Sequence, residues 1–354
     1  MSNAVVIISS ETSYLEDKTA ALGYDVYAFD EYTHKNLNKV SNIKYLKSFI
    51  KNISNQHQNI YLIYGSGLED KKNIYEVLNA HLIINCNTLD LLRKSGDLCS
   101  LKDMVEGSDL RLPSDTNANS LTTRLISKPL HSYGGFNIRF ETQYKEKYYT
   151  EQYIPGDTYS ASFFINDENF MFLGFNKLFL LKDYKAHPFI HAGAIMCNDI
   201  NDSQKIIRSM DRLSRKLEMK GYNSIDFKIH KKQIFIVDIN PRITSTFKIY
   251  NDIYNNSLLN HQINPYNIIP IKKINKDKKY GFVNIFVKEK TKYDYDLSND
   301  NAFINTPKMG DIVEKDQPLL SIYLNANNPG LLLRKLKQKI SITTNLFSCY
   351  DIDI

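Results

Sequence analysis

The sequence predicts a protein of the α/β and α+β classes, in which a small open parallel sheet precedes a larger, mostly β region. Three observations predict this arrangement. Strand-like and helix-like segments alternate over residues 1–95, as they do in βαβ units. Strand-like segments then dominate from Leu125 to Ile239. A length of 354 residues suggests two or three domains, and we place them at 1–95, 96–250 and 265–354.

The composition excludes several classes of protein. Hydrophobic residues make up 42% of the chain, which allows a packed core and excludes wholesale disorder. No apolar run approaches the roughly 18–20 residues that span a bilayer, and we expect no signal peptide. The four Cys show no C-x-x-C spacing, so a reducing, cytoplasmic location fits. The net charge of +6 comes from scattered lysines without a recognised motif, so we expect no nucleic-acid or membrane partner.

The first region begins with Ala4–Ser9, a largely apolar run that is typical of a buried parallel strand. A helix from Thr12 to Leu22 follows, with a hydroxyl residue at its start and Gly23 at its end. Ligands of open α/β sheets lie beyond the carboxyl ends of strands, which is where Gly65-Ser66-Gly67 falls, although a plain strand-to-helix turn explains this stretch equally well. The other expected segments are strands at Tyr24–Asp30, Ile60–Tyr64 and His81–Asn85, and helices at Leu46–Ile53 and Ile74–Leu78.

The pattern changes after residue 96. The clearest later helix is Ser203–Lys220, whose apolar residues follow helical spacing and which Gly221 would cap. The Asn-rich stretch Asn251–Asn267 is the expected linker. The other expected elements are a short helix at Leu98–Val105, strands at Gly281–Val287 and Leu319–Leu324, a turn at Met309–Asp311 and a helix at Gly330–Lys337.

A Gly-containing loop follows a strand that carries Lys128. Glycines at 134 and 135 would let backbone N–H groups approach phosphate oxygens, because they have no Cβ in the way. Lys128 could reach the same phosphates as a point charge. Taken alone, this motif is also consistent with a β-hairpin that has a generous turn.

A second motif is a strand at Tyr149–Ile154 that ends in a Pro-Gly turn. Glu151 through Ile154 would offer backbone donors and acceptors together with a carboxylate, and these groups suit the edge and amino group of an adenine. An ordinary turn explains the same residues.

The third motif is two strands joined near Lys231-Lys232. If residues 231–233 form the loop, Asp226 falls opposite Asp238, and Asn240 shares their face of the sheet. Two facing carboxylates repel each other unless a cation neutralises them. Mg²⁺ with oxygen ligands is the usual solution.

Arg242 follows this strand by two residues. Its guanidinium could hold a carboxylate or a phosphorylated acyl group through two hydrogen bonds. Exposed carboxylates on a plain hairpin are the alternative, but Asp-Ile-Asn-Pro-Arg is an unusual ending for such a strand.

Together, these motifs resemble the ATP-grasp superfamily, and they occur in that family's order between Lys128 and Arg242. More narrowly, the chain is similar to ATP-dependent carboligases related to biotin carboxylase. It also resembles the ligases that join tyramine to glutamate in methanofuran assembly, which share its Asp-x-Asn-Pro-Arg-x-Thr ending. The resemblance covers about residues 1–250 and implies an ATP-grasp fold preceded by a small, Rossmann-like α/β domain.

The resemblance also implies roles for single residues. ATP and one or two Mg²⁺ ions would be the cofactors. The phosphates of ATP would be bound by Lys128, Ser132, Gly134 and Gly135, and the adenine would be lined by Glu151, Gln152 and Ile154, with Asp157 near the ribose. The metal would be held by Asp226, Asp238 and Asn240. The acyl phosphate would be stabilised by Arg242, and the acceptor site would be lined by Lys177 and His191.

The chain departs from the family pattern in three places. Many members carry a second phosphate-binding Lys where this sequence has Leu98, so either Lys94 or Lys102 substitutes for it, or no second Lys is used. Asp238 stands where many members have Glu. Asn137 stands where a further Gly is common.

The implied function is an ADP-forming carboxylate–amine ligase that depends on ATP and Mg²⁺. Its substrates would be a small-molecule carboxylate and an amine, and the tyramine–glutamate relatives extend the expectation to cofactor biosynthesis. Two alternatives are an ATP-dependent phosphotransferase and a nucleotide-binding regulatory module without turnover. A two-fold homodimer is the default expectation for the assembly.

Overall fold

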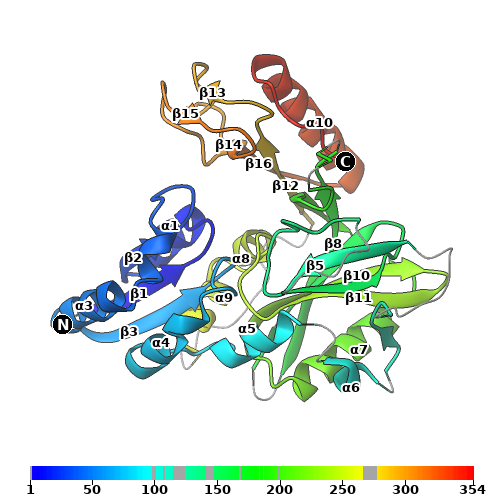
Figure 1. The fold of residues 1–354 in the computed structure, drawn as a ribbon. Coiled ribbons are helices and arrows are strands. Elements are labelled where there is room, and N and C mark those ends of the chain that lie inside the picture. The colour runs from blue at the N-terminus through cyan, green and yellow to red at the C-terminus, as the bar shows by residue number, and fades with distance from the viewer. Residues whose placement is uncertain are drawn as a thin grey trace.

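The computed structural model describes residues 2–97, 101–106, 108–114, 124–140, 147–166, 169–182, 184–185, 187–197, 200–265 and 277–354. Figure 1 shows an N-terminal unit in blue, a central unit in cyan to yellow, and a C-terminal unit in orange to red. The mixed α/β class with a small parallel sheet at the N-terminus confirms the predicted fold class.

The N-terminal unit is built on three parallel strands in the order β2-β1-β3. These strands are β1 (Ser2–Ile8), β2 (Asp25–Phe29) and β3 (His57–Tyr64). Alternate residues of β1 face opposite sides: Val6 packs with α3 (Ile43–Ser54) and α4 (Tyr75–His81), whereas Val5 packs with α1 (Ser13–Ala21). Both faces are therefore covered, as the apolar run in β1 predicts.

One expected element of this unit is wrong. The segment His81–Asn85 forms no strand and contributes only an isolated bridge between Ile83 and Tyr61. The α4 helix continues through His81, the first residue of the expected strand, and only Ile83 of the following residues pairs with β3. The remaining short helices of this part of the chain are α2 (Leu37–Val40), η1 (Lys72–Ile74), α5 (Leu89–Ser95) and α6 (Lys102–Val105).

A nine-stranded sheet joins the central and C-terminal units, in the order β14-β16-β12-β9-β8-β7-β10-β11-β4. The C-terminal strand β12 pairs directly with the central strand β9, so the two units share one sheet. Its strands are β4 (Leu110–Arg111), β7 (Thr158–Ile165), β8 (Phe170–Leu180), β9 (His191–Cys197), β10 (Gly221–His230), β11 (Gln233–Asn240), β12 (Lys279–Phe286), β14 (Phe303–Ile304) and β16 (Pro318–Ala326).

Two small ribbons complete the strands of the described chain. The pair β5 (Leu125–Pro129) and β6 (Tyr148–Gln152) contacts the large sheet through Lys128 of β5, whose side chain reaches the backbone of Val237 in β11. The pair β13 (Thr291–Lys292) and β15 (Ile312–Val313) belongs to the C-terminal unit.

The helix α7 (Ser203–Lys216) covers one face of the large sheet through Ile206, Met210 and Leu213. It ends before the expected Lys220, because Glu218 adopts a left-handed conformation with φ 51°. Gly221 is therefore not the cap of this helix, and it opens β10 instead.

The expected linker Asn251–Asn267 is also wrong over its described part. It contains the end of α8 (Phe247–Ile253) and all of α9 (Ser257–Ile263), and both helices pack on the second face of the N-terminal sheet. Leu258 and Leu259 are fully buried there. The Asn-rich composition hides these apolar positions, and residues 266 and 267 lie outside the described chain.

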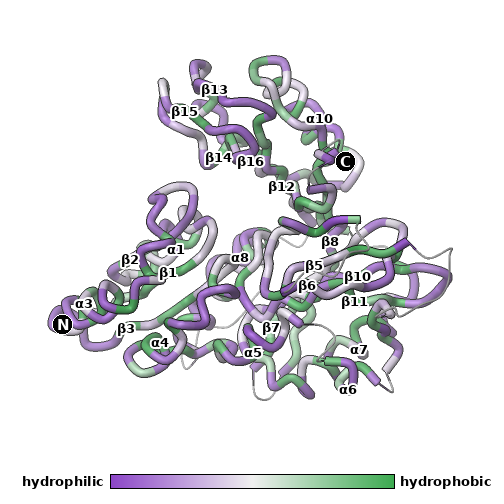
Figure 2. The backbone as a smooth tube through the Cα atoms, viewed as in Figure 1, coloured by the Kyte–Doolittle hydropathy of each residue, from purple (hydrophilic) through white to green (hydrophobic). Residues whose placement is uncertain are grey.

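The longest described helix is α10 (Pro329–Leu346), which extends well beyond the expected end at Lys337. The side chain of Asn328 caps it by accepting a hydrogen bond from the N–H of Leu331 at 2.8 Å. Hydrophobic and hydrophilic residues alternate along it over short distances (Figure 2). Among the described residues, no helix combines the length and the apolar character needed to cross a bilayer.

Candidate active site

A cavity of about 1600 Å³ lies where the three units meet. The N-terminal unit lines it at the carboxyl ends of β1 and β3, as expected for an open α/β sheet. The central unit contributes the β5–β6 ribbon and the hairpin β10–β11, and the C-terminal unit contributes β12 and β16.

Lys128 and Glu151 form an ion pair across the β5–β6 ribbon. The Lys128 Nζ and Glu151 Oε1 atoms are 2.6 Å apart, and the two residues are only 7% and 3% exposed. Burial raises the pKa of Glu151, although the charge of Lys128 partly offsets this effect. The Lys128 Nζ also donates a hydrogen bond to the carbonyl oxygen of Val237 at 2.8 Å.

Val237 lies at a β-bulge in the β10–β11 hairpin. The loop of this hairpin has two residues, Lys231 and Lys232, both with positive φ, and not the three that the sequence suggested. Phe227 then pairs with Ile236, but Asp226 pairs with Asp238. The extra residue of the bulge restores the predicted aspartate pairing although the predicted loop is wrong.

Asp226, Asp238 and Asn240 line the cavity from neighbouring positions of this hairpin. The amide of Asn240 donates a hydrogen bond to Asp226 Oδ2 at 3.4 Å. Burial and the charge of Asp238 raise the pKa of Asp226. Two carboxylates and an amide oxygen match the oxygen ligands that Mg²⁺ takes, and a bound cation would relieve the repulsion between the carboxylates.

Arg242 is held in place by Glu69, which sequence reasoning did not single out as a site residue. The Arg242 Nε atom donates a hydrogen bond to Glu69 Oε1 at 2.5 Å, and the residues are 6% and 4% exposed. The other carboxylate oxygen of Glu69 accepts from the N–H of Gly67 at 2.7 Å. The turn after β3 therefore positions an arginine that lies 173 residues later in the chain.

The glycine loop rests on the segment before β9. Gly134 and Gly135 have φ values of 66° and 80°, and the carbonyl oxygen of Gly134 accepts a hydrogen bond from the N–H of His191. A Cβ on Gly135 would lie 1.8 Å from the carbonyl oxygen of Phe189. Close packing therefore requires this glycine independently of any phosphate. Asn137 also has a positive φ of 60°, which asparagine tolerates better than most residues.

A family model of the ATP-grasp domain matches residues 97–246. These residues form an ATP-grasp domain. The match confirms the resemblance to the ATP-grasp superfamily.

The chain is also similar to an uncharacterized protein of Methanocaldococcus jannaschii, at 28% identity over 216 residues. The match covers 58% of this chain and 52% of the relative, so it spans about half of the length of that curated protein.

Solved structures resemble nearly the whole chain at low identity. An L-amino acid ligase from Bacillus licheniformis has a TM-score of 0.70 at 11% identity, with 96% of each chain covered. An N5-carboxyaminoimidazole synthetase from Staphylococcus aureus in complex with ADP has a TM-score of 0.70 at 12% identity, again with 96% of each chain covered. A biotin carboxylase from Campylobacter jejuni has a TM-score of 0.68 at 12% identity and covers 99% of this chain and 87% of its own. At these identities the likeness concerns the fold.

Most of the predicted site residues of the ATP-grasp domain line the cavity. Besides those described above, they include Ser132, Gln152, Ile154 and His191. The His191 Nε2 atom is buried without a hydrogen-bond partner among the described residues. Burial lowers the pKa of His191 to about 4.

Asp157 and Lys177 do not line the cavity. They form an ion pair of 2.9 Å with each other on the other face of the sheet. Side chains alternate along a strand, and it is Thr158 of β7 and Leu178 of β8 that face the cavity. The structure therefore does not bring these two residues to the ribose and acceptor positions that the resemblance implied.

Neither of the two lysines that could substitute for the second phosphate-binding Lys lines the cavity. Lys94 forms an ion pair with Asp90 at 2.9 Å, and neither Lys94 nor Lys102 reaches the cavity. Leu98, which occupies the family position, lies outside the described residues.

Lys228 does line the cavity, and sequence reasoning missed it. It is two residues after Asp226 on β10, so the alternation that directs Asp226 into the cavity directs Lys228 there as well. Its Nζ donates to the carbonyl oxygen of Gly156 at 2.7 Å. Burial and the charge of Lys128 lower the pKa of Lys228 to about 8.

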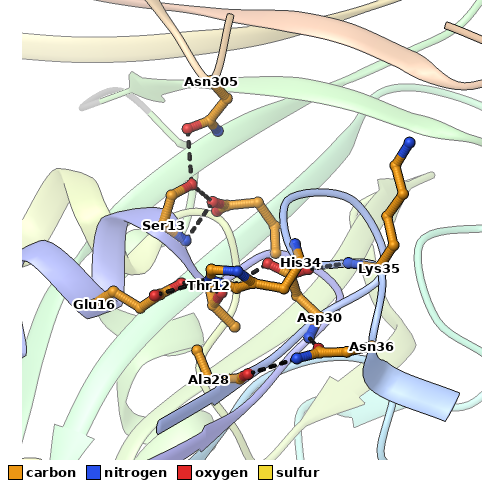
Figure 3. Close-up of polar contacts among 10 residues, drawn as sticks. Thr12, Ser13, Glu16, Ala28, Asp30, His34, Lys35, Asn36 and Asn305 are labelled. Carbon is orange, nitrogen blue, oxygen red and sulfur yellow. Dashed lines mark hydrogen bonds and ion pairs between the residues drawn. The ribbon is translucent and has the colours of Figure 1, made fainter. Parts of the chain in front are cut away.

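A polar network borders the cavity on the side of α1 (Figure 3). Ser13 Oγ donates a hydrogen bond to Asn305 Oδ1 at 3.0 Å, which links the N-terminal and C-terminal units. Behind it, Asp30 is fully buried and accepts from Thr12 Oγ1 at 2.7 Å and from the N–H of His34 at 2.6 Å. Glu16 approaches His34 Nε2 at 3.0 Å. These contacts fix the loop that follows β2.

Proposed function

We propose that the chain is an ATP- and Mg²⁺-dependent ligase that joins a small-molecule carboxylate to an amine. The observation that carries this proposal is the convergence of three kinds of group in one cavity. These are two facing carboxylates with an asparagine, a buried lysine beside a glycine loop, and a buried arginine held by Glu69. Each kind suits one part of the reaction of a carboxylate with ATP.

The proposed reaction has two steps. An oxygen of the substrate carboxylate attacks the γ-phosphorus of ATP, the bond to the bridging oxygen breaks, and ADP and an acyl phosphate form. The amine nitrogen then attacks the acyl carbon and loses a proton, while inorganic phosphate leaves with the electron pair of the broken C–O bond. The products are ADP, phosphate and an amide.

The residues of the chain act by position and charge. Lys128 and the glycine loop would bind the phosphates, and the strand end at Glu151–Ile154 would face the adenine. Arg242 would bind the acyl phosphate through its guanidinium. Asp226, Asp238 and Asn240 would hold Mg²⁺, which neutralises phosphate charge when it is bound.

The comparisons support the proposal at the level of the fold. The ATP-grasp domain carries every proposed nucleotide and metal residue between 97 and 246. Structures of similar fold are named as a ligase, a synthetase and a carboxylase.

The test is a screen of small carboxylates against amines, scored by the release of ADP and of phosphate. We expect at least one pair to give stoichiometric ADP, phosphate and amide, and we expect Asp238→Ala combined with Asn240→Ala to abolish this turnover. Lys47→Met is a matched control, because Lys47 is exposed on α3 and does not line the cavity. ADP without phosphate would indicate transfer to a hydroxyl group, and MgATP binding without turnover would indicate a regulatory module. Either result contradicts the ligase proposal.

A further inference from the structure

Lys248 is a buried lysine in the wall of the cavity that the proposed reaction does not use. It lies on α8, eight residues after Asn240, and only 9% of it is exposed. Its Nζ is 4.2 Å from the centre of the Phe282 ring and 5.4 Å from that of Tyr323. Over the described parts of the chain, the Nζ of Lys248 has neither a hydrogen bond nor an ion pair.

The acidic residues nearby are already engaged. Asp252 accepts hydrogen bonds from the hydroxyl groups of Tyr14 at 2.7 Å and Tyr323 at 2.8 Å, and it pairs with Lys18 at 3.6 Å. Glu11, the other acid that acts on Lys248 through its charge, accepts from the backbone N–H of Ser13 at 2.8 Å. A buried cation without a hydrogen bond or an ion pair is unfavourable, and the two aromatic rings offset this cost only in part, so Lys248 is left to attract an anion that enters the cavity.

The surface beside Lys248 carries further hydrogen-bond donors. Asn284 shares a face of β12 with Phe282, and both Asn284 and Ser321 line the cavity. Ser321 Oγ donates a hydrogen bond to Asn284 Oδ1 at 2.8 Å, which fixes the amide and leaves its NH₂ group as a donor. The ring of His191 is 6.0 Å from that of Phe282. These residues come from β9, β12 and β16, and not from the β5–β6 ribbon that would hold the nucleotide.

We propose that Lys248 and Asn284 form an oxyanion site that binds a carboxylate of the substrate acid. This inference rests on the proposed function, because it gives the carboxylate of the acid substrate a binding position in the same cavity. The phosphates of the nucleotide are the other source of oxyanions, and the experiment separates the two sources.

The direct test follows Lys248 by NMR in the full chain labelled with ¹³C at the lysine Cε atoms. The resonance of Lys248 is the one that disappears in Lys248→Arg. The protein is first saturated with MgADP and then titrated with acetate and succinate, with acetamide and succinamide as neutral controls. We expect the Lys248 resonance to shift with both carboxylates and with neither amide. If MgADP alone produces the full shift of the Lys248 resonance, or if neither carboxylate shifts this resonance, the proposal is overturned.

A second test uses an acid–amine pair that turns over. Lys248→Met is expected to raise the KM for the acid at least about tenfold, since a buried charged hydrogen bond is lost. The Kd for MgADP is expected to change less than twofold. Lys248→Arg should recover most of the KM effect, and Lys47→Met is the matched control. Equal effects of Lys248→Met on acid and nucleotide would overturn the assignment.

The two proposals fail in distinguishable ways. If no acid–amine pair releases ADP but acetate still shifts the Lys248 resonance, the ligase function is wrong and the oxyanion site stands. If turnover is found but Lys248→Met leaves the KM for the acid unchanged, the ligase function stands and the site is wrong.

Discussion

The buried ion pair between Glu69 and Arg242 makes a quantitative prediction for Glu69→Gln. Both side chains are less than 10% exposed, and the Arg242 Nε and Glu69 Oε1 atoms are 2.5 Å apart. Removal of one partner from a buried pair costs about 3–5 kcal/mol, because the other charge remains buried without compensation. Gln keeps an oxygen that can accept from the N–H of Gly67, so we expect a loss near the lower end, about 3 kcal/mol.

Asp211→Asn provides the matched control. Asp211 also pairs with an arginine Nε, that of Arg215 at 2.8 Å, but their side chains are 36% and 47% exposed. Exposed pairs at this helical spacing contribute only about 0.3–0.5 kcal/mol. The two substitutions therefore test burial while they keep the chemistry of the pair the same.

The assay is urea unfolding followed by far-UV circular dichroism, since the chain has no Trp, with ADP formation measured in parallel. We expect Glu69→Gln to lower the free energy of unfolding several-fold more than Asp211→Asn does. It should also lower kcat, because Arg242 would lose the group that positions it. Equal stability losses for the two variants, with unchanged turnover in both, would refute this reasoning.

Two further predictions concern the glycine loop and His191. Gly135→Ala should cost at least about 2 kcal/mol more than Gly134→Ala. The reason is that a Cβ added to Gly135 would lie 1.8 Å from the carbonyl oxygen of Phe189, whereas a Cβ added to Gly134 would have a ring atom of Phe136 at 3.4 Å as its nearest neighbour. Equal unfolding free energies for the two variants would contradict this prediction. The pKa of His191 falls from 6.5 to about 4 on folding. The unfolded state then binds the proton first, so stability falls as the pH drops from 6.5 towards 4, by at most about 1.4 kcal/mol per pH unit. His191→Gln should flatten this slope in urea unfolding series, and an unchanged slope would show that His191 is not the group responsible.

The sequence predicted those parts of the site that depend on short-range pattern. Alternation along two strands predicted that Asp226, Asp238 and Asn240 come together, but the pairing forms only because a bulge at Val237 compensates for the wrong loop length. The same alternation could have identified Lys228, which lies two residues beyond Asp226.

The missed features depend on contacts between distant segments. Nothing near Glu69 in the sequence indicates that it holds Arg242, because the pair forms only when the N-terminal unit packs against the ATP-grasp domain. Lys177 looked available for an acceptor, but the strand directs it to Asp157 on the far face. The helices α8 and α9 were hidden by their Asn residues, and α8 carries Lys248 into the cavity.

The central claim is that Asp226 and Asp238 hold Mg²⁺ beside a bound nucleotide. Calorimetric titration with MgATP tests it most directly, with the wild-type chain compared with Asp226→Asn combined with Asp238→Asn, and with Asp211→Asn as the control. We predict Mg²⁺-dependent binding to the wild type and the control, and a loss of affinity of at least about tenfold, or about 1.4 kcal/mol, in the double variant. Equal affinity of all three proteins for MgATP would contradict the account.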